Sequence, residues 1–167
     1  MVLGLVLFSI GTGLVSAQSD ISSLLKTGDE SFAARKYDAA WKAYESANKA
    51  SGEKCSVCLS KMALVKFYQH DEGAALKLVE KAIAASSNPK QHADALATKG
   101  EILVMLGDKN DKRLAAAEEA FRNACKEDPD ADIYQVRLGN VLLREGKMDE
   151  GKAELETEAI LFRGPFR

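Results

Sequence analysis

The chain has 167 residues, of which 46% are hydrophobic and 29% are charged, and its formal net charge is −2 at neutral pH. Lysine and arginine alternate with aspartate and glutamate along the sequence, which excludes the clustered basic charge that nucleic-acid binding needs. Only 3 prolines interrupt the chain, and this composition favours a protein built from helices.

The first 17 residues, MVLGLVLFSIGTGLVSA, carry no charged side chain. Their apolar run is about as long as a signal-peptide core, and Val15, Ser16 and Ala17 stand where a signal peptidase reads small residues. The basic residue that usually precedes such a run is lacking. An uncleaved membrane anchor is the alternative, but the run is shorter than the roughly 20 residues that span a bilayer. We predict a signal peptide over residues 1–17 and a bacterial periplasmic or secreted protein that begins at Gln18.

The remaining residues, 18–167, contain no second apolar span and are predicted to form one helical domain. Asp20, Asn88 and Asp130 have side chains that accept hydrogen bonds from a first helical turn, so they are expected to cap helix starts. Gly107 and Gly146 are expected to end two helices in the left-handed conformation. The predicted helices cover residues 20–34, 37–50, 55–69, 72–86, 89–106, 112–127, 131–145 and 148–162.

Small residues recur in these helices at close to one fixed period. Two antiparallel helices approach closely only where one presents glycine or alanine, while a bulky residue one turn later fills the remaining gap. The resulting unit of about 34 residues is typical of a helix–turn–helix solenoid. The four predicted repeats cover about residues 21–54, 55–88, 89–130 and 131–164. The small residues of the first helices are Gly28, Ala63, Gly100 and Gly139, those of the second helices are Ala40, Ala75, Ala117 and Gly151, and the bulky residues are Tyr44, Val79, Phe121 and Leu155.

These positions resemble the tetratricopeptide repeat (TPR) family. The resemblance implies an all-α, right-handed superhelical solenoid of four helix–turn–helix repeats. It also implies a non-enzymatic scaffold that binds a peptide or protein on a concave face, which the first helix of each repeat lines. The residues that match the family pattern are Gly28, Tyr37, Ala40, Tyr44 and Ala47 in the first repeat and Gly100, Gly107, Ala117, Phe121, Ala124 and Pro129 in the third.

The resemblance also indicates which side chains would line the concave face. For Phe32, Phe67 and Met105, the alternative is a place in the core between repeats. Family members that hold a C-terminal carboxylate do so with basic and amide side chains on consecutive first helices. This chain has Leu25 and Asp29 at the first-repeat positions, so an acidic tail held in that way is not expected. The candidate partner-binding residues are Leu25, Asp29, Phe32, Leu64, Phe67, Tyr68, Glu101, Met105, Asn140 and Arg144.

Three cysteines are the other candidates for chemistry. Cys55 and Cys58 lie one helical turn apart, and a structural disulfide, two reduced thiols and a redox-active pair all remain open. Cys125 is expected to be a small buried hydrophobe. A zinc site would need four ligands in close groups. His70 lies about four turns from Cys55 along the same predicted helix, too far to share a metal, and His92 on the next first helix could approach the cysteine pair only in a favourable geometry. We predict no catalytic residue, no cofactor and no metal.

The chain ends in LFRGPFR, without the polar capping helix that usually closes a repeat array. The apolar face of the last repeat would then dock on a further domain, a partner or a second copy of the chain. The repeat segment with its Cys-x-x-Cys is similar to one that precedes a thioredoxin-like domain of the TlpA type in exported bacterial proteins. The alternative function is therefore an accessory region of a thiol–disulfide oxidoreductase whose thioredoxin-like domain lies downstream.

Overall fold

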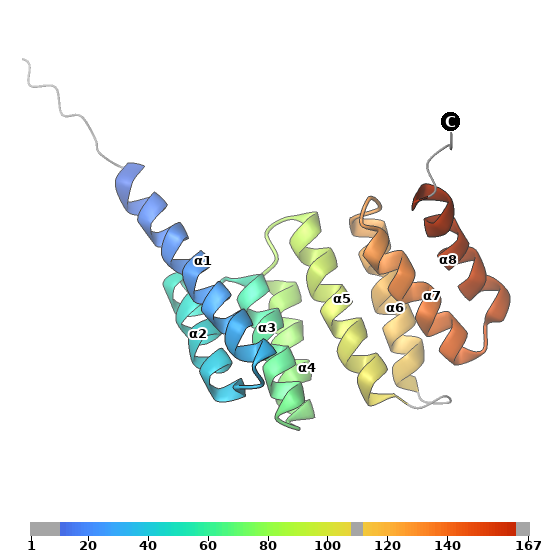
Figure 1. Cartoon of the computed structure of the whole chain (residues 1–167), viewed down its shortest axis with the longest axis horizontal. Helices are drawn as coiled ribbons and strands as arrows, with labels where there is room; N and C mark the ends of the chain where they lie inside the picture. Colours follow the sequence, from blue (N-terminus) through green and yellow to red (C-terminus); the bar gives the residue numbers. More distant parts are fainter. Residues whose placement is uncertain (1–10, 108–111, 163–167) are drawn as a thin grey trace, which may run out of the picture.

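The computed structural model describes residues 11–107 and 112–162, and this part of the chain contains eight helices and no strand. The helices pack as four successive pairs, arranged side by side along the long axis of the molecule (Figure 1). The predicted all-helical solenoid is confirmed. The helices are α1 (Gly11–Ala33), α2 (Tyr37–Ala50), α3 (Ser56–Tyr68), α4 (Glu72–Ala84), α5 (Pro89–Leu106), α6 (Lys112–Glu127), α7 (Asp132–Glu145) and α8 (Met148–Phe162).

Of the three predicted helix caps, the structure has one. Asn88 caps α5 as predicted, and its Oδ1 accepts a hydrogen bond of 2.9 Å from the Gln91 amide. The predicted cap at Asp20 is wrong, because α1 already begins at Gly11 and a residue inside a helix cannot cap its start. The predicted cap at Asp130 is also wrong. This residue lies in the turn before α7, and Ala131 occupies the cap position without a side-chain hydrogen bond.

The ends of α5 and α7 differ from each other. Gly146 ends α7 in the left-handed conformation as predicted, with φ of 84°. Gly107 does not, since its φ of −95° is extended backbone. The reason lies in two arginines that donate to the free carbonyls of α5: Arg113 bonds the Leu106 oxygen at 2.7 Å, and Arg144 bonds the oxygens of Val104 and Gly107 at 3.0 and 3.1 Å. These side chains satisfy carbonyls that a left-handed glycine cap would otherwise serve.

Small residues set the spacing within each helix pair. Gly28 of α1 faces the ring of Tyr44 on α2, and Gly100 of α5 faces the ring of Phe121 on α6. A Cβ atom on Gly100 would lie 2.7 Å from that ring, so a larger residue would force the two helices apart. The same pairing of a small residue with a bulky one relates Gly139 to Leu155, and it brings Ala63 and Val79 into one core cluster.

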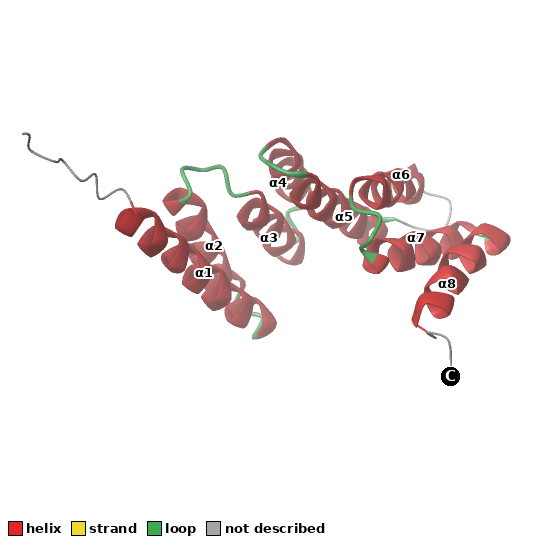
Figure 2. Cartoon of the chain, turned by 90° about the horizontal axis from the view of Figure 1, so that it is seen from above, coloured by secondary structure: helices red, strands yellow, loops and turns green. Residues whose placement is uncertain are grey.

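Adjacent repeats stack through the contacts of α2 with α3, α4 with α5, and α6 with α7, and α3 also packs against α5 (Figure 2). At the junction of the first two repeats, Trp41 of α2 packs against a core that includes Met62 and Val65 of α3. The ammonium of Lys66 lies 4.5 Å from the centre of the Trp41 ring. A cation over an aromatic face adds a favourable electrostatic contact to this apolar junction.

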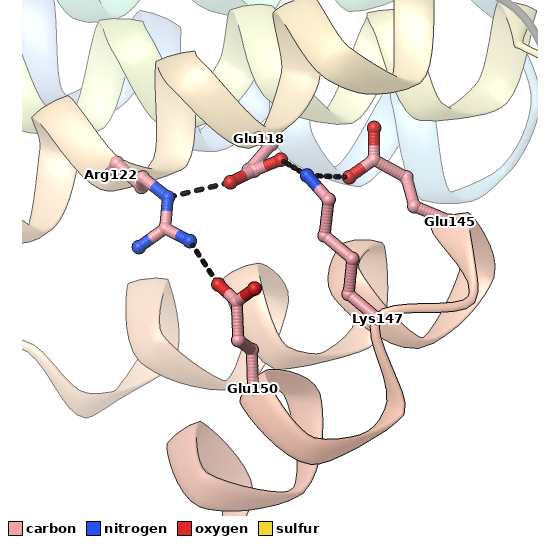
Figure 3. A network of polar contacts seen from close by, with 5 residues as sticks. All are labelled: Glu118, Arg122, Glu145, Lys147 and Glu150. Atoms are coloured by element: carbon pink, nitrogen blue, oxygen red, sulfur yellow. Dashed lines mark hydrogen bonds and ion pairs between the residues drawn. The ribbon is translucent and has the colours of Figure 1, made fainter.

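Charged side chains join the last repeat to the third (Figure 3). Arg122 of α6 contacts Glu118 on its own helix at 2.7 Å and Glu150 of α8 at 2.9 Å. Lys147, between α7 and α8, contacts Glu118 and lies 3.0 Å from a carboxylate oxygen of Glu145. Burial favours the neutral acid, but the hydrogen bonds from Lys147 and Arg122 outweigh it and hold the pKa of Glu118 at about 2.

The predicted signal peptide and the predicted docking of the last repeat concern the two ends of the chain. Residues 1–10 of the predicted signal peptide and residues 163–167 beyond α8 lie outside the part of the chain that the structure describes. None of the described helices is long and apolar enough to cross a membrane.

Candidate binding groove

A hollow of about 410 Å³ runs across the odd-numbered helices of the array. All four of these helices contribute to its walls, and the fully buried ring of Phe121 on α6 forms part of its floor. The hollow is therefore a feature of the array and not of any one repeat. Its lining residues are Phe32 of α1, Leu64 and Tyr68 of α3, Glu101, Val104 and Met105 of α5, Phe121 of α6, and Arg137, Asn140, Val141 and Arg144 of α7.

A second hollow, of about 320 Å³, lies on the same helices α3, α5 and α7. It shares Leu64, Glu101 and Arg137 with the first. The two hollows therefore adjoin each other at these residues, and together we call them the groove. The remaining lining residues of the second hollow are Ser56, Val57, Ser60, Lys61, Asp94, Ala97, Thr98, Ile133 and Tyr134.

Seven of the ten candidate partner-binding residues line the first hollow: Phe32, Leu64, Tyr68, Glu101, Met105, Asn140 and Arg144. The other three are engaged elsewhere. Leu25 and Phe67 pack against core clusters without lining the hollow, whereas Phe32 and Leu64 pack against the same clusters and also line it. Asp29 accepts hydrogen bonds of 2.7 Å from the Tyr44 hydroxyl and from the Lys61 ammonium, which tie α1 to α2 and α3.

Three wall residues of the first hollow, Val104, Arg137 and Val141, are not among the candidates, and neither are the residues that only the second hollow contributes. Helical spacing was the signal that would have found the first three. Val104 lies three residues after Glu101, and Arg137 lies three residues before Asn140. Residues three or four apart share one helix face, so the faces of α5 and α7 that carry the candidates carry these residues as well.

Aromatic side chains gather where the groove reaches α1 and α3. The Tyr68 ring lies 5.3 Å from the rings of Phe32 and Phe67 and 5.6 Å from that of Tyr37, measured between ring centres. Tyr68 is nevertheless 42% exposed. It therefore combines packing against three rings with a face that is open to the groove, an arrangement common for aromatic side chains at interfaces.

The middle of the groove carries one ion pair. Arg137 of α7 lies 2.8 Å from Glu101 of α5. Burial raises the pKa of Glu101, and the charge of Arg137 opposes that rise. Arg144 also lines the groove, but its guanidinium already donates to two carbonyls of α5, so it contributes more to the wall than to free binding capacity. Asn140 lies on the same wall and is exposed, so its side-chain amide is available to a ligand.

The cysteines lie at different places. Cys55 and Cys58 form a disulfide at the start of α3. Cys125 is a free thiol, half-buried against the core of the last two repeats, where burial raises its pKa. Among the described residues, no group of histidine, cysteine and carboxylate side chains is arranged to hold a metal ion. His92 instead contacts Glu127 at 3.2 Å.

Comparison with known proteins gives similarity in structure alone. No protein-family model matches the sequence, and no curated protein matches it at a significant level. A thermophilic TPR protein from Thermus thermophilus superposes with a TM-score of 0.65 at 19% identity, over 81% of this chain and 71% of the other. The first TPR of Spaghetti (RPAP3), in a structure with an HSP90 peptide, gives a TM-score of 0.59 at 18% identity, over 74% of this chain and 93% of the other.

An O-GlcNAc transferase from Thermobaculum terrenum is also similar, with a TM-score of 0.61 at 19% identity over 75% of this chain. This chain corresponds to only 22% of that enzyme's length. Identities this low establish the arrangement of the helices and leave ligands and activity open. Together with the paired small and bulky residues and the four stacked helix pairs, these neighbours show that the chain has a TPR-like fold.

Proposed function

We propose that the chain is a non-enzymatic interaction module that binds a segment of another protein along the groove. The observation that carries the proposal is the pair of adjoining hollows over the odd-numbered helices, of which the first has walls from all four repeats. Such a surface suits an extended polypeptide better than a compact ligand, because contacts are spread along the whole array. The peptide in the similar RPAP3 structure supports this use of the fold.

The lining of the first hollow indicates what the segment presents. Leu64, Val104 and Met105 give it apolar walls, and the aromatic cluster closes one end. Its volume of about 410 Å³ falls within the range of about 300–1,000 Å³ that is usual for ligand sites. We infer that a large apolar side chain of the partner is buried there, while the polar groups of Glu101, Arg137 and Asn140 contact its backbone or charged side chains.

Two exposed methionines allow a matched test. Met105 is 42% exposed inside the groove, and Met148 is 52% exposed at the start of α8, outside it. A random peptide library would be selected against the wild-type protein, and the affinities of the recovered peptides would be measured for Met105→Glu and Met148→Glu. We expect Met105→Glu to weaken binding about tenfold or more, because it places a charge against an apolar anchor, and this corresponds to at least about 1.4 kcal/mol.

Met148→Glu is expected to leave the affinity within about twofold, since a surface charge far from the contact changes little. Circular dichroism would verify that both variants keep the helical content of the wild type. Equal losses for the two variants, or unchanged binding by Met105→Glu, would show that the groove is not the binding surface.

The proposal includes export from the cytoplasm. Its support is the uncharged apolar sequence over residues 1–17 and the small residues at positions 15–17. The role as an accessory region of a thiol–disulfide oxidoreductase stays a prediction, as does docking through the last repeat.

A further inference from the structure

The Cys55–Cys58 disulfide joins two residues of the same helical turn. It crosses neither a helix pair nor a junction between repeats. Those junctions are held by apolar clusters and by contacts such as Asp29 with Lys61 and Glu101 with Arg137. A bridge within one turn does little to hold the array together, which raises the question of what else this pair does.

The two sulfurs differ in accessibility. Cys58 is completely buried, whereas Cys55 is partly exposed at the cap position before α3. Thiol–disulfide exchange requires an attacking thiolate to approach one sulfur directly. In the native protein, the buried Cys58 is closed to such an attack, which leaves the partly exposed Cys55 as the residue to be attacked.

Local structure also prepares Cys55 to hold a negative charge after reduction. The Cys58 amide donates a hydrogen bond of 3.1 Å to the Cys55 sulfur, which lies at the positive end of α3. Asn48 fixes the backbone there, because its Oδ1 accepts a hydrogen bond of 3.2 Å from the Cys55 amide. Helix N-termini and amide donors stabilise thiolates, so the reduced form of this pair is favoured and its disulfide is the more readily given up.

We propose that the Cys55–Cys58 pair transfers its disulfide to a dithiol in another protein. A thiolate of that dithiol bonds to the Cys55 sulfur, and the Cys55–Cys58 bond breaks with its electron pair on Cys58, which takes up a proton. The second thiolate then attacks the partner's sulfur in the mixed disulfide and releases Cys55 as a thiolate. The partner loses two electrons and gains a disulfide, and the cysteine pair is reduced by the same two electrons.

The groove passes beside this pair. Ser56 and Val57, the two residues between the cysteines, line its second hollow. A segment that lies in the groove therefore passes next to Cys55. The exchange itself does not depend on the proposed binding function, because a free dithiol can approach the partly exposed Cys55 from solvent.

The first test measures the transfer. The oxidised protein, carrying Cys125→Ser so that only one pair is present, is mixed at pH 7 with a reduced peptide that contains two cysteines. Acid-quenched samples are analysed by mass spectrometry. We expect one peptide disulfide per protein chain and complete reduction of Cys55 and Cys58. A pair that stays oxidised in the presence of excess peptide would overturn the proposal.

The second test measures the thiolate. In the Cys58→Ser, Cys125→Ser variant, the pH dependence of alkylation reports the pKa of Cys55 alone. We expect a pKa at least about one unit below the ordinary value of about 8.5. The linear peptide of residues 52–62 with the same Cys58→Ser change is the control without the fold, and its cysteine should titrate normally. Equal pKa values in the protein and the peptide would overturn the proposal.

Discussion

At the scale of single residues, Gly28, Gly100 and Gly139 determine how closely the two helices of a repeat pack. Each faces the bulky residue of the partner helix, and the space for a Cβ atom is already occupied. Their repetition along the sequence is what made the helix pairing predictable. Glycine weakens an isolated helix, so its retention inside α1, α5 and α7 indicates that close packing outweighs the loss of helix propensity.

Alanine at two glycine positions should have opposite effects on stability. Gly100→Ala places a Cβ atom 2.7 Å from the Phe121 ring and is expected to lower the free energy of unfolding by about 1–3 kcal/mol through overpacking. Gly73→Ala in α4 meets nothing within 4 Å and is expected to raise it by about 0.5–1 kcal/mol through helix propensity. Urea unfolding followed by circular dichroism measures both changes. Equal stabilisation by the two substitutions would contradict the role of Gly100 as a packing site.

At the scale of helices, sequence rules correctly predicted two of the ends that are settled locally. Asn88 and Gly146 act through their own backbone neighbours, and both predictions are confirmed. Gly107 shows the limit of such rules. The carbonyl oxygens of Val104 and Gly107, at the end of α5, accept hydrogen bonds from Arg144, which reaches across from α7 in the next repeat. No local pattern around residue 107 signals a donor that is 37 residues away in the chain.

The ion network that joins α6 to α7 and α8 makes stability depend on pH. The native pKa of Glu118, about 2, lies below the value of about 4.3 for an unfolded glutamate. The unfolded chain therefore binds the proton first, and the stabilisation present above about pH 5 is lost as the pH falls toward 2. We expect the difference in unfolding free energy between the wild type and Glu118→Gln to shrink between about pH 5 and pH 3.

Urea unfolding at a series of pH values measures this difference. Glu119→Gln alters an exposed carboxylate on the same helix and serves as the matched control. Its difference from the wild type should stay nearly constant over the same range. A constant difference for Glu118→Gln would mean that the network does not couple protonation to folding.

At the scale of the whole molecule, the sequence predicted candidate residues on the first helix of each repeat but did not predict the outline of the groove. The repeat register gives the direction in which a side chain leaves its helix. It does not give how closely neighbouring repeats approach, and that decides whether Phe67 is covered by the core and whether Arg137 reaches Glu101. Helical spacing places Val104 and Val141 on the faces of α5 and α7 that carry the candidates. That these two faces border one hollow is a relation between repeats that no single repeat encodes.

Export can be tested directly on the chain. Expressed in a bacterium with its own start, the protein is expected in the periplasm with Gln18 as its first residue, because cleavage should follow Ala17. N-terminal sequencing of the periplasmic fraction measures this. Ala17→Arg should block cleavage and leave a longer chain. Recovery of the wild-type protein with Met1 from the cytosolic fraction would contradict export.

The single tryptophan of the sequence, Trp41, lies at the junction of the first two repeats and beneath the ammonium of Lys66. Its fluorescence therefore reports on that junction alone, whereas far-ultraviolet ellipticity reports on every helix. Extensive contacts link each repeat only to the next, so the two optical signals need not change together during denaturation. The difference between the midpoints of the fluorescence and ellipticity curves measures how strongly unfolding at the first junction is coupled to unfolding of the other repeats.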